Sequence, residues 1–153
     1  MEGIFSIERR GYEYINNEVD LNLRTKMKSK ILNLSLILTS LIGYLEWGGN
    51  NKMFLFQGEI EIVSKLFNDP TSVIHPFTLL PLIGQILLAF TLFQKNPSKI
   101  ITFLGLGGIG LLLLFMFVIG IMSANFKILI STVPFLVTGI LVIRYHREKK
   151  INS

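Results

Sequence analysis

Four polar side chains lie within or beside apolar stretches of the chain, where they could act together. They are Glu46, Glu59, His75 and Gln85. Carboxylates, an imidazole and an amide in one place could relay a proton, bind a cation or bind a polar headgroup, and polar groups at membrane depth are commonly functional. These four residues are therefore the candidates for a ligand-binding site, provided that the fold brings them together.

Three of the candidates also have an ordinary structural explanation. Glu46 precedes Trp47, a residue type found at membrane interfaces, so its carboxylate could simply face water at a helix end. His75 precedes Pro76, which favours the first turn of a helix. Gln85 could form a hydrogen bond to a neighbouring helix. The sequence leaves both explanations open for these three residues.

No spacing of residues matches a metal site or a complete catalytic motif. The chain has no cysteine, which excludes disulfides, thiolate ligands and thiol redox chemistry. Gly105, Gly107 and Gly110 satisfy the G-x-G-x-x-G pattern of dinucleotide-binding turns, but they lie inside an apolar run instead of between a strand and a helix. We expect no metal and no cofactor, and the balance is against an enzyme.

Four long apolar segments are the elements that must position these residues. They cover about 31–47, 77–93, 100–122 and 128–143. Each is close to the roughly 20 residues that an α-helix needs to cross the hydrocarbon core of a bilayer. The sequence therefore predicts an all-α, polytopic membrane protein, in which a four-transmembrane-helix bundle occupies residues 31–147.

The first external loop, residues 48–76, contains a further periodic pattern. Its apolar stripe consists of Phe56, Ile60, Val63 and Phe67. These positions share one face of a helix, whereas Glu61 and Lys65 point the opposite way. We expect an amphipathic helix that lies flat over the outer mouth of the bundle, with the stripe resting on lipid or on the spans below.

The distribution of basic residues predicts the orientation. If both termini are cytoplasmic, all of the 15 Lys and Arg residues except Lys52, Lys65 and Lys127 lie on the cytoplasmic side. Residues 1–30 then form a cytoplasmic segment, either an amphipathic interfacial helix or a solvated tail, and residues 148–153 form a short cytoplasmic tail. The formal charge of +5 arises beside the spans, so no nucleic-acid partner is expected. We place the protein as a multi-pass protein in a bacterial inner membrane.

Glycine and proline inside the spans indicate where helices pack or bend. Gly105 and Gly108 in the third span would allow a neighbouring helix to approach closely. Pro81 and Pro134 each remove one backbone hydrogen bond from their helix and could produce a kink. We interpret all four residues as determinants of packing.

Two functions fit this sequence. The first is a non-catalytic integral membrane protein that acts as an accessory or interaction subunit, with membrane lipid and other membrane subunits or further copies of itself as partners. The second is a small transporter, channel, or lipid- or ion-binding protein that uses an outer-side polar pocket. The discriminating feature is whether the polar groups of the outer side face one another or face water.

Overall fold

The computed structural model describes residues 2–47 and 51–151 and has five α-helices, one 3-10 turn and a β-hairpin. The elements are α1 (Glu2–Leu41), β1 (Tyr44–Trp47), β2 (Asn51–Phe54), α2 (Leu55–Asn68), η1 (Pro70–Ser72), α3 (Pro76–Phe93), α4 (Lys99–Met122) and α5 (Phe126–Ile151). The prediction of a helical protein is confirmed. The two-stranded hairpin was not expected.

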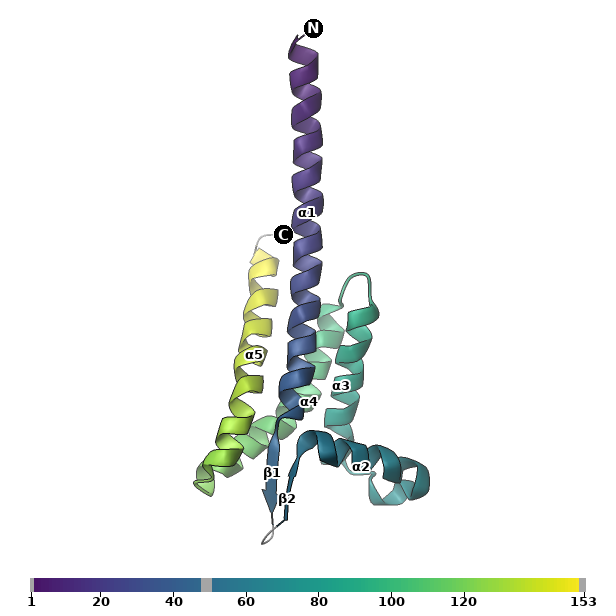
Figure 1. The fold of residues 1–153 in the computed structure, drawn as a ribbon, viewed down its shortest axis with the longest axis vertical. Helices are drawn as coiled ribbons and strands as arrows, with labels where there is room; N and C mark the ends of the chain where they lie inside the picture. The colour runs from purple at the N-terminus through teal and green to yellow at the C-terminus, as the bar shows by residue number, and fades with distance from the viewer. Residues whose placement is uncertain (1, 48–50, 152–153) are drawn as a thin grey trace.

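The C-terminal part of α1 lies side by side with α3, α4 and α5, and we call these four packed helices the helix cluster (Figure 1). Its core is apolar and draws on every member. The largest fully buried side chains are Phe135, Leu36, Leu88, Ile109 and Leu113. Helix α2 crosses one end of the helix cluster, beside the hairpin (Figure 1). At the other end, α1 continues well beyond α3, α4 and α5.

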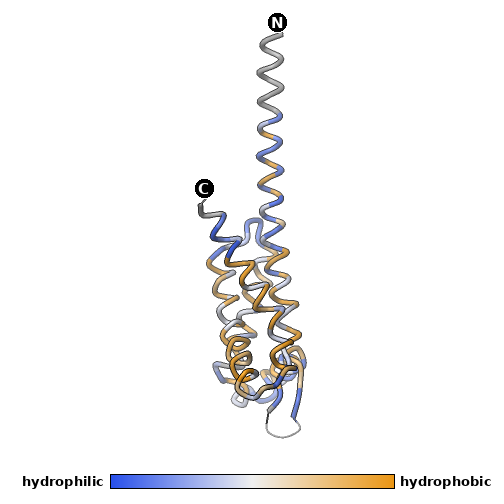
Figure 2. Tube along the Cα trace, turned by 90° about the vertical axis from the view of Figure 1, so that its left-hand side faces the viewer, coloured by the Kyte–Doolittle hydropathy of each residue, from blue (hydrophilic) through white to orange (hydrophobic). Residues whose placement is uncertain are grey.

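The outer surface of the helix cluster is also apolar. Figure 2 shows hydrophobic residues concentrated where the four helices lie together, and hydrophilic residues alternating with hydrophobic ones along the coloured part of α1 beyond them. Within the described residues, Lys99–Met122 and Phe126–Glu148 are long and apolar enough to cross a membrane, and Thr78–Phe93 is a shorter apolar helix. Two of the four predicted spans therefore meet the length and composition of a membrane-crossing helix, which points to membrane association.

The first predicted span differs most from the structure. Its helix ends at Leu41 instead of Trp47, and residues Tyr44–Trp47 form β1, which pairs antiparallel with β2. Aromatic residues in both strands favour extended backbone. Gly43 marks the change of direction: its carbonyl accepts a hydrogen bond of 2.7 Å from the Leu55 amide.

The other boundary of this span is also absent from the structure. Helix α1 runs without a break from the segment predicted as a separate cytoplasmic unit, residues 1–30, into the apolar part of the helix. The reason is local, because no glycine or proline occurs between residues 12 and 42 to end the helix. Helix α5 likewise continues past the predicted end at residue 143, to Ile151.

The remaining helices begin and end close to the predicted positions. Helix α2 covers the amphipathic pattern of the loop, and α3 and α4 each start one residue before the predicted spans. Pro81 lies inside α3 and Pro134 inside α5, and both helices continue through them. The Thr138 hydroxyl donates a hydrogen bond of 2.8 Å to the Pro134 carbonyl.

Glycines bring α3 and α4 into close contact. A Cβ atom on Gly105 would lie 2.8 Å from the carbonyl oxygen of Gly84, and one on Gly108 would lie 2.8 Å from the carbonyl oxygen of Leu80. Both distances are too short for any side chain larger than hydrogen, so the two backbones pack directly against each other. In contrast, nothing lies within 4 Å of a Cβ placed on Gly107.

Candidate functional site

Helix α2 presents an acidic residue, and not its apolar stripe, to the rest of the protein. Leu55 and Glu59, one turn apart, are its buried residues, and Glu59 is only 9% exposed. The predicted apolar stripe faces outward instead, with Phe56 42%, Ile60 66% and Phe67 82% exposed. Phe56, Ile60 and Val63 nevertheless line a hollow with Leu41 of α1 and Leu82 of α3, so one edge of the stripe adjoins the helices below and its exposed part is left for lipid.

The buried position of Glu59 is explained by polar partners on two other helices. The Gln85 side chain on α3 donates hydrogen bonds from Nε2 to Glu59 Oε1 at 2.6 Å and to Ser40 Oγ on α1 at 3.0 Å. Ser40 Oγ in turn donates to the Ile37 carbonyl at 2.7 Å. This chain of bonds joins α1, α2 and α3, so it determines which face of α2 is turned inward.

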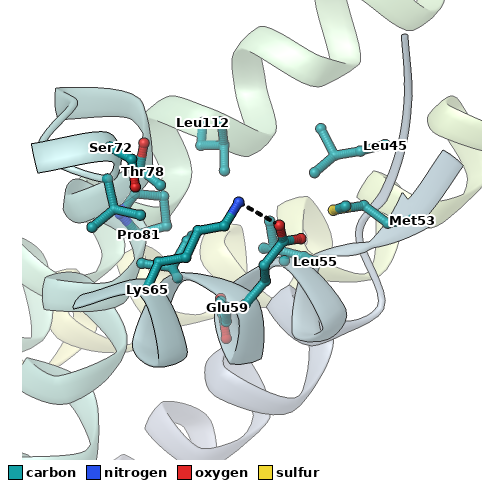
Figure 3. A pocket seen from close by; sticks show the side chains of 13 residues that line it. Leu45, Met53, Leu55, Glu59, Lys65, Ser72, Thr78, Pro81 and Leu112 are labelled. Atoms are coloured by element: carbon teal, nitrogen blue, oxygen red, sulfur yellow. Dashed lines mark hydrogen bonds and ion pairs between the residues drawn. The ribbon is translucent and has the colours of Figure 1, made fainter. Parts of the chain in front are cut away.

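Two hollows adjoin the Glu59 side chain. The hairpin-side hollow, about 320 Å³, lies between α2, the hairpin and the first turns of α3 (Figure 3). The helix-side hollow, about 340 Å³, lies between α2, α1 and α3. Apart from Glu59, which lines both, the helix-side hollow is lined by Leu41, Phe56, Ile60, Val63 and Leu82. In the helix-side hollow, the Glu59 carboxylate is therefore the polar group of an otherwise apolar wall.

The hairpin-side hollow has more polar groups than the helix-side hollow, and Glu61 lines it as well as Glu59. Lys65 lines it, but its Nζ atom forms an ion pair of 2.6 Å with Glu61 Oε1, drawn as the dashed line in Figure 3. Ser72 and Thr78 contribute hydroxyl groups to the same lining. The larger part of the lining consists of apolar side chains, among them Leu45 and Leu112.

Burial raises the pKa of the Glu59 carboxyl from 4.5 to about 7, and the hydrogen bond from Gln85 opposes this rise. Desolvation disfavours the carboxylate form, whereas an amide donor favours it. Near neutral pH both protonation states are populated, so Glu59 can take up or release a proton with small changes in its surroundings.

We expect the contact between α2 and the helix cluster to weaken as the pH rises from about 4.5 to about 7, because the folded chain binds the Glu59 proton more tightly than the unfolded chain does over this interval. Below this interval both states are protonated, and above it both are charged. Amide hydrogen exchange of α2, corrected for intrinsic rates, measures the effect. Glu59→Gln should abolish the dependence of the corrected exchange rates on pH, and Glu61→Gln should keep it. An equal pH dependence in both variants would contradict the assignment of this effect to Glu59.

Glu46 and His75 lie outside this group. Glu46 is exposed on β1, and its Oε2 atom accepts a hydrogen bond of 2.9 Å from Asn125, whose Oδ1 atom accepts from the Lys127 amide at 3.1 Å. His75 is exposed just before α3, and its carbonyl accepts the amides of Thr78 and Leu79. In the described part of the chain, neither residue lines a hollow beside Glu59. The structure thus brings together Glu59 and Gln85 only.

Sequence reasoning missed a second polar cluster inside the helix cluster. Asn33 of α1 donates hydrogen bonds from Nδ2 to Thr91 Oγ1 at 2.7 Å and to Thr102 Oγ1 at 2.9 Å, and all three residues are fully buried. Asn33, Leu36 and Ser40 share one face of α1. An asparagine within an apolar helix was the available signal, since an amide at such a position needs partners.

No metal centre emerges among the residues that the structure describes: no group of three or more His, Asp or Glu side chains there could bind a metal ion. What this part of the protein offers chemically is one carboxylic acid whose pKa is raised to about 7, one amide, an ion pair, two hydroxyl groups and apolar side chains. Comparison of the chain with protein-family models, with curated proteins and with solved structures finds no match.

Proposed function

We propose that α3, α4, α5 and the apolar part of α1 cross a bacterial inner membrane as a four-span bundle with both termini in the cytoplasm. The two long apolar helices support this, as do the exposed apolar side chains on the remaining helices and the basic residues at one end. The hairpin and α2 then lie at the outer surface. There the exposed stripe of α2 contacts the headgroup region of the lipid.

We infer that the protein acts in this membrane as a non-catalytic interaction subunit. The carrying observation is the length of α1, a helix of 40 residues that extends past the ends of α3, α4 and α5 (Figure 1). An isolated helix in water is only marginally stable, because its hydrogen bonds must offset the cost of ordering the chain. A second surface that packs against this part of α1 would supply the missing stabilisation.

The exposed part of α1 has one continuous apolar ridge. It consists of Ile15, Val19, Leu23 and Met27, each more than half exposed. Residues four apart form a ridge that fits the groove of a second helix. Charged residues flank it and would form the polar rim of such a contact. The partner is therefore a helix of another membrane subunit or of a second copy of the chain.

Changing this ridge should release the partner. We expect a tagged full-length chain, purified from its native membrane in mild detergent, to retain a stoichiometric partner that is lost when Val19→Glu and Leu23→Glu are combined. The matched control combines Asn17→Glu and Leu21→Glu, which place the same charges at the same spacing on the opposite face of α1. Mass spectrometry and native mass measurement identify the partner. Equal retention, or equal loss, in the two variants would rule out the ridge as the contact.

A second function, ligand binding at an outer-side pocket, is favoured by one specific observation. Two of the predicted site residues, Glu59 and Gln85, are joined by a hydrogen bond of 2.6 Å next to two hollows. Pockets of a few hundred Å³ with apolar walls and few polar groups are typical of small-ligand sites. This function needs only the region around α2 and is independent of the α1 ridge.

A further inference from the structure

The charge around Glu59 is not balanced by the side chains that line its two hollows. Of the described residues in these linings, Lys65 is the one cation, and it is already paired with Glu61. The hydrogen-bond partner of Glu59 is the neutral amide of Gln85. Desolvation destabilises a carboxylate in an apolar surrounding that has no cation beside it. A bound positive charge would therefore stabilise its ionised form.

The apolar walls restrict the kind of cation that would bind. A small inorganic ion needs several oxygen ligands, and the helix-side hollow offers none from its other lining side chains, which are Leu41, Phe56, Ile60, Val63 and Leu82. An organic cation with an apolar body would place its charge next to Glu59 and its hydrocarbon or aromatic surface against these side chains. Aromatic faces such as that of Phe56 also attract organic cations.

We propose that Glu59 and the helix-side hollow form a binding site for a lipophilic organic cation. This inference rests on the second function proposed above, ligand binding near α2, and it names the class of ligand. The helix-side hollow adjoins the outward stripe of α2 through Phe56, Ile60 and Val63, so such a ligand can enter from the lipid surface. The ion pair of Glu61 with Lys65 is left unchanged by binding.

Binding and protonation compete for the same carboxyl group. When the neutral acid binds the cation, the Oε–H bond breaks, the proton passes to the solvent and the cation takes its place, so the net charge of the site does not change. The other charged groups that face this region are Glu61 and Lys65, both on α2; the described residues that line it from α1, α3, α4 and the hairpin are uncharged. Because burial raises the Glu59 pKa to about 7, affinity should fall roughly tenfold for each pH unit below that value.

The test uses a pair of probes with the same shape and opposite charge. Tetraphenylphosphonium and tetraphenylborate are titrated at about pH 8, where Glu59 is mostly ionised, into the full-length chain in lipid nanodiscs, and heats from empty nanodiscs are subtracted. We expect saturable binding of the cation at one site per chain and none of the anion. Saturable binding of both probes, or of neither, would overturn the proposal.

Two variants identify the carboxylate that is responsible. Glu59→Gln keeps the shape and the hydrogen bond with Gln85 but removes the charge, so cation affinity should fall by at least about tenfold. Glu46→Gln removes a carboxylate on β1 that lines neither hollow and should change the affinity by less than about twofold. Unchanged affinity in Glu59→Gln would overturn the proposal.

A measurement on the unmodified chain covers the case in which Glu59→Gln does not fold. At about pH 6, binding should release close to one proton per cation, measured as the dependence of the binding heat on the ionisation enthalpy of the buffer. Binding without proton release would show that the cation uses another site. If the cation, the anion and a neutral amphiphile all fail to bind, the proposed ligand-binding function is wrong. If the neutral amphiphile binds and the cation does not, the ligand-binding function stands and the class of ligand is wrong.

Discussion

Replacing Gly105 with valine is expected to destabilise the protein by about 1–3 kcal/mol or more. Gly107→Val should change the stability by about a few tenths of a kcal/mol, because the neighbouring helix occupies the space beside Gly105 and not the space beside Gly107. A Cβ atom on Gly105 would lie 2.7 Å from Leu88 Cγ and 2.8 Å from the Gly84 carbonyl oxygen. The leucine tip could rotate, but the backbone oxygen cannot move away without separating α3 from α4.

The two glycines form a matched pair within one helix. Both lie inside α4 and both gain the same side chain, so the effects of helix propensity and of added apolar surface are shared. A difference between the variants therefore measures the contact between helices. Thermal unfolding of the purified full-length variants in one detergent gives the comparison. Equal stabilities would show that α3 and α4 do not pack through Gly105.

The second large effect is expected from Asn33→Asp. Asn33 is fully buried and donates hydrogen bonds to two threonine hydroxyls, Thr91 and Thr102, whereas an aspartate at this position has no amide hydrogens to donate. An ionised carboxylate there would also be removed from water, with threonine hydroxyls and no cation as its described hydrogen-bond partners. Leaving one buried charge unpaired costs about 3–5 kcal/mol, so we expect a loss of this order or a failure to fold.

An exposed asparagine on the same helix provides the control. Asn22→Asp makes the same chemical change at an exposed position of α1 and should shift stability by no more than about 0.5 kcal/mol. Thermal unfolding and the yield of folded protein after detergent extraction measure both variants. If Asn33→Asp is as stable as Asn22→Asp, the bonds of Asn33 to Thr91 and Thr102 do not form in the protein.

Part of the candidate site was accessible from the sequence. An acid and an amide beside apolar segments are unusual, and this property alone selected Glu59 and Gln85, which the structure joins by a hydrogen bond. The same criterion selected Glu46 and His75, which have other surroundings. Residue type identifies a side chain that needs a partner, but it does not identify the partner.

The orientation of α2 illustrates why the remainder could not be predicted. The periodicity of its apolar residues correctly indicated a helix over Leu55–Asn68, yet the strongest apolar stripe faces outward and Glu59 faces inward. The direction depends on Gln85 and Ser40, which are far away in the sequence and belong to two other helices. Burial of an apolar stripe is the rule for a helix in water, and it is not required where lipid could cover the stripe instead.

Properties that depend on neighbouring residues could be predicted from the sequence: the helical segments, the approximate ends of α3 and α4, and the apolar surface of the chain. The end of α1 at Leu41, the hairpin that follows it and the polar contacts between helices became known only from the folded chain. The physical reason is that helix formation follows from local hydrogen bonds and side-chain periodicity. Which helices touch, and through which residues, follows from the packing of surfaces that the chain brings together over long distances.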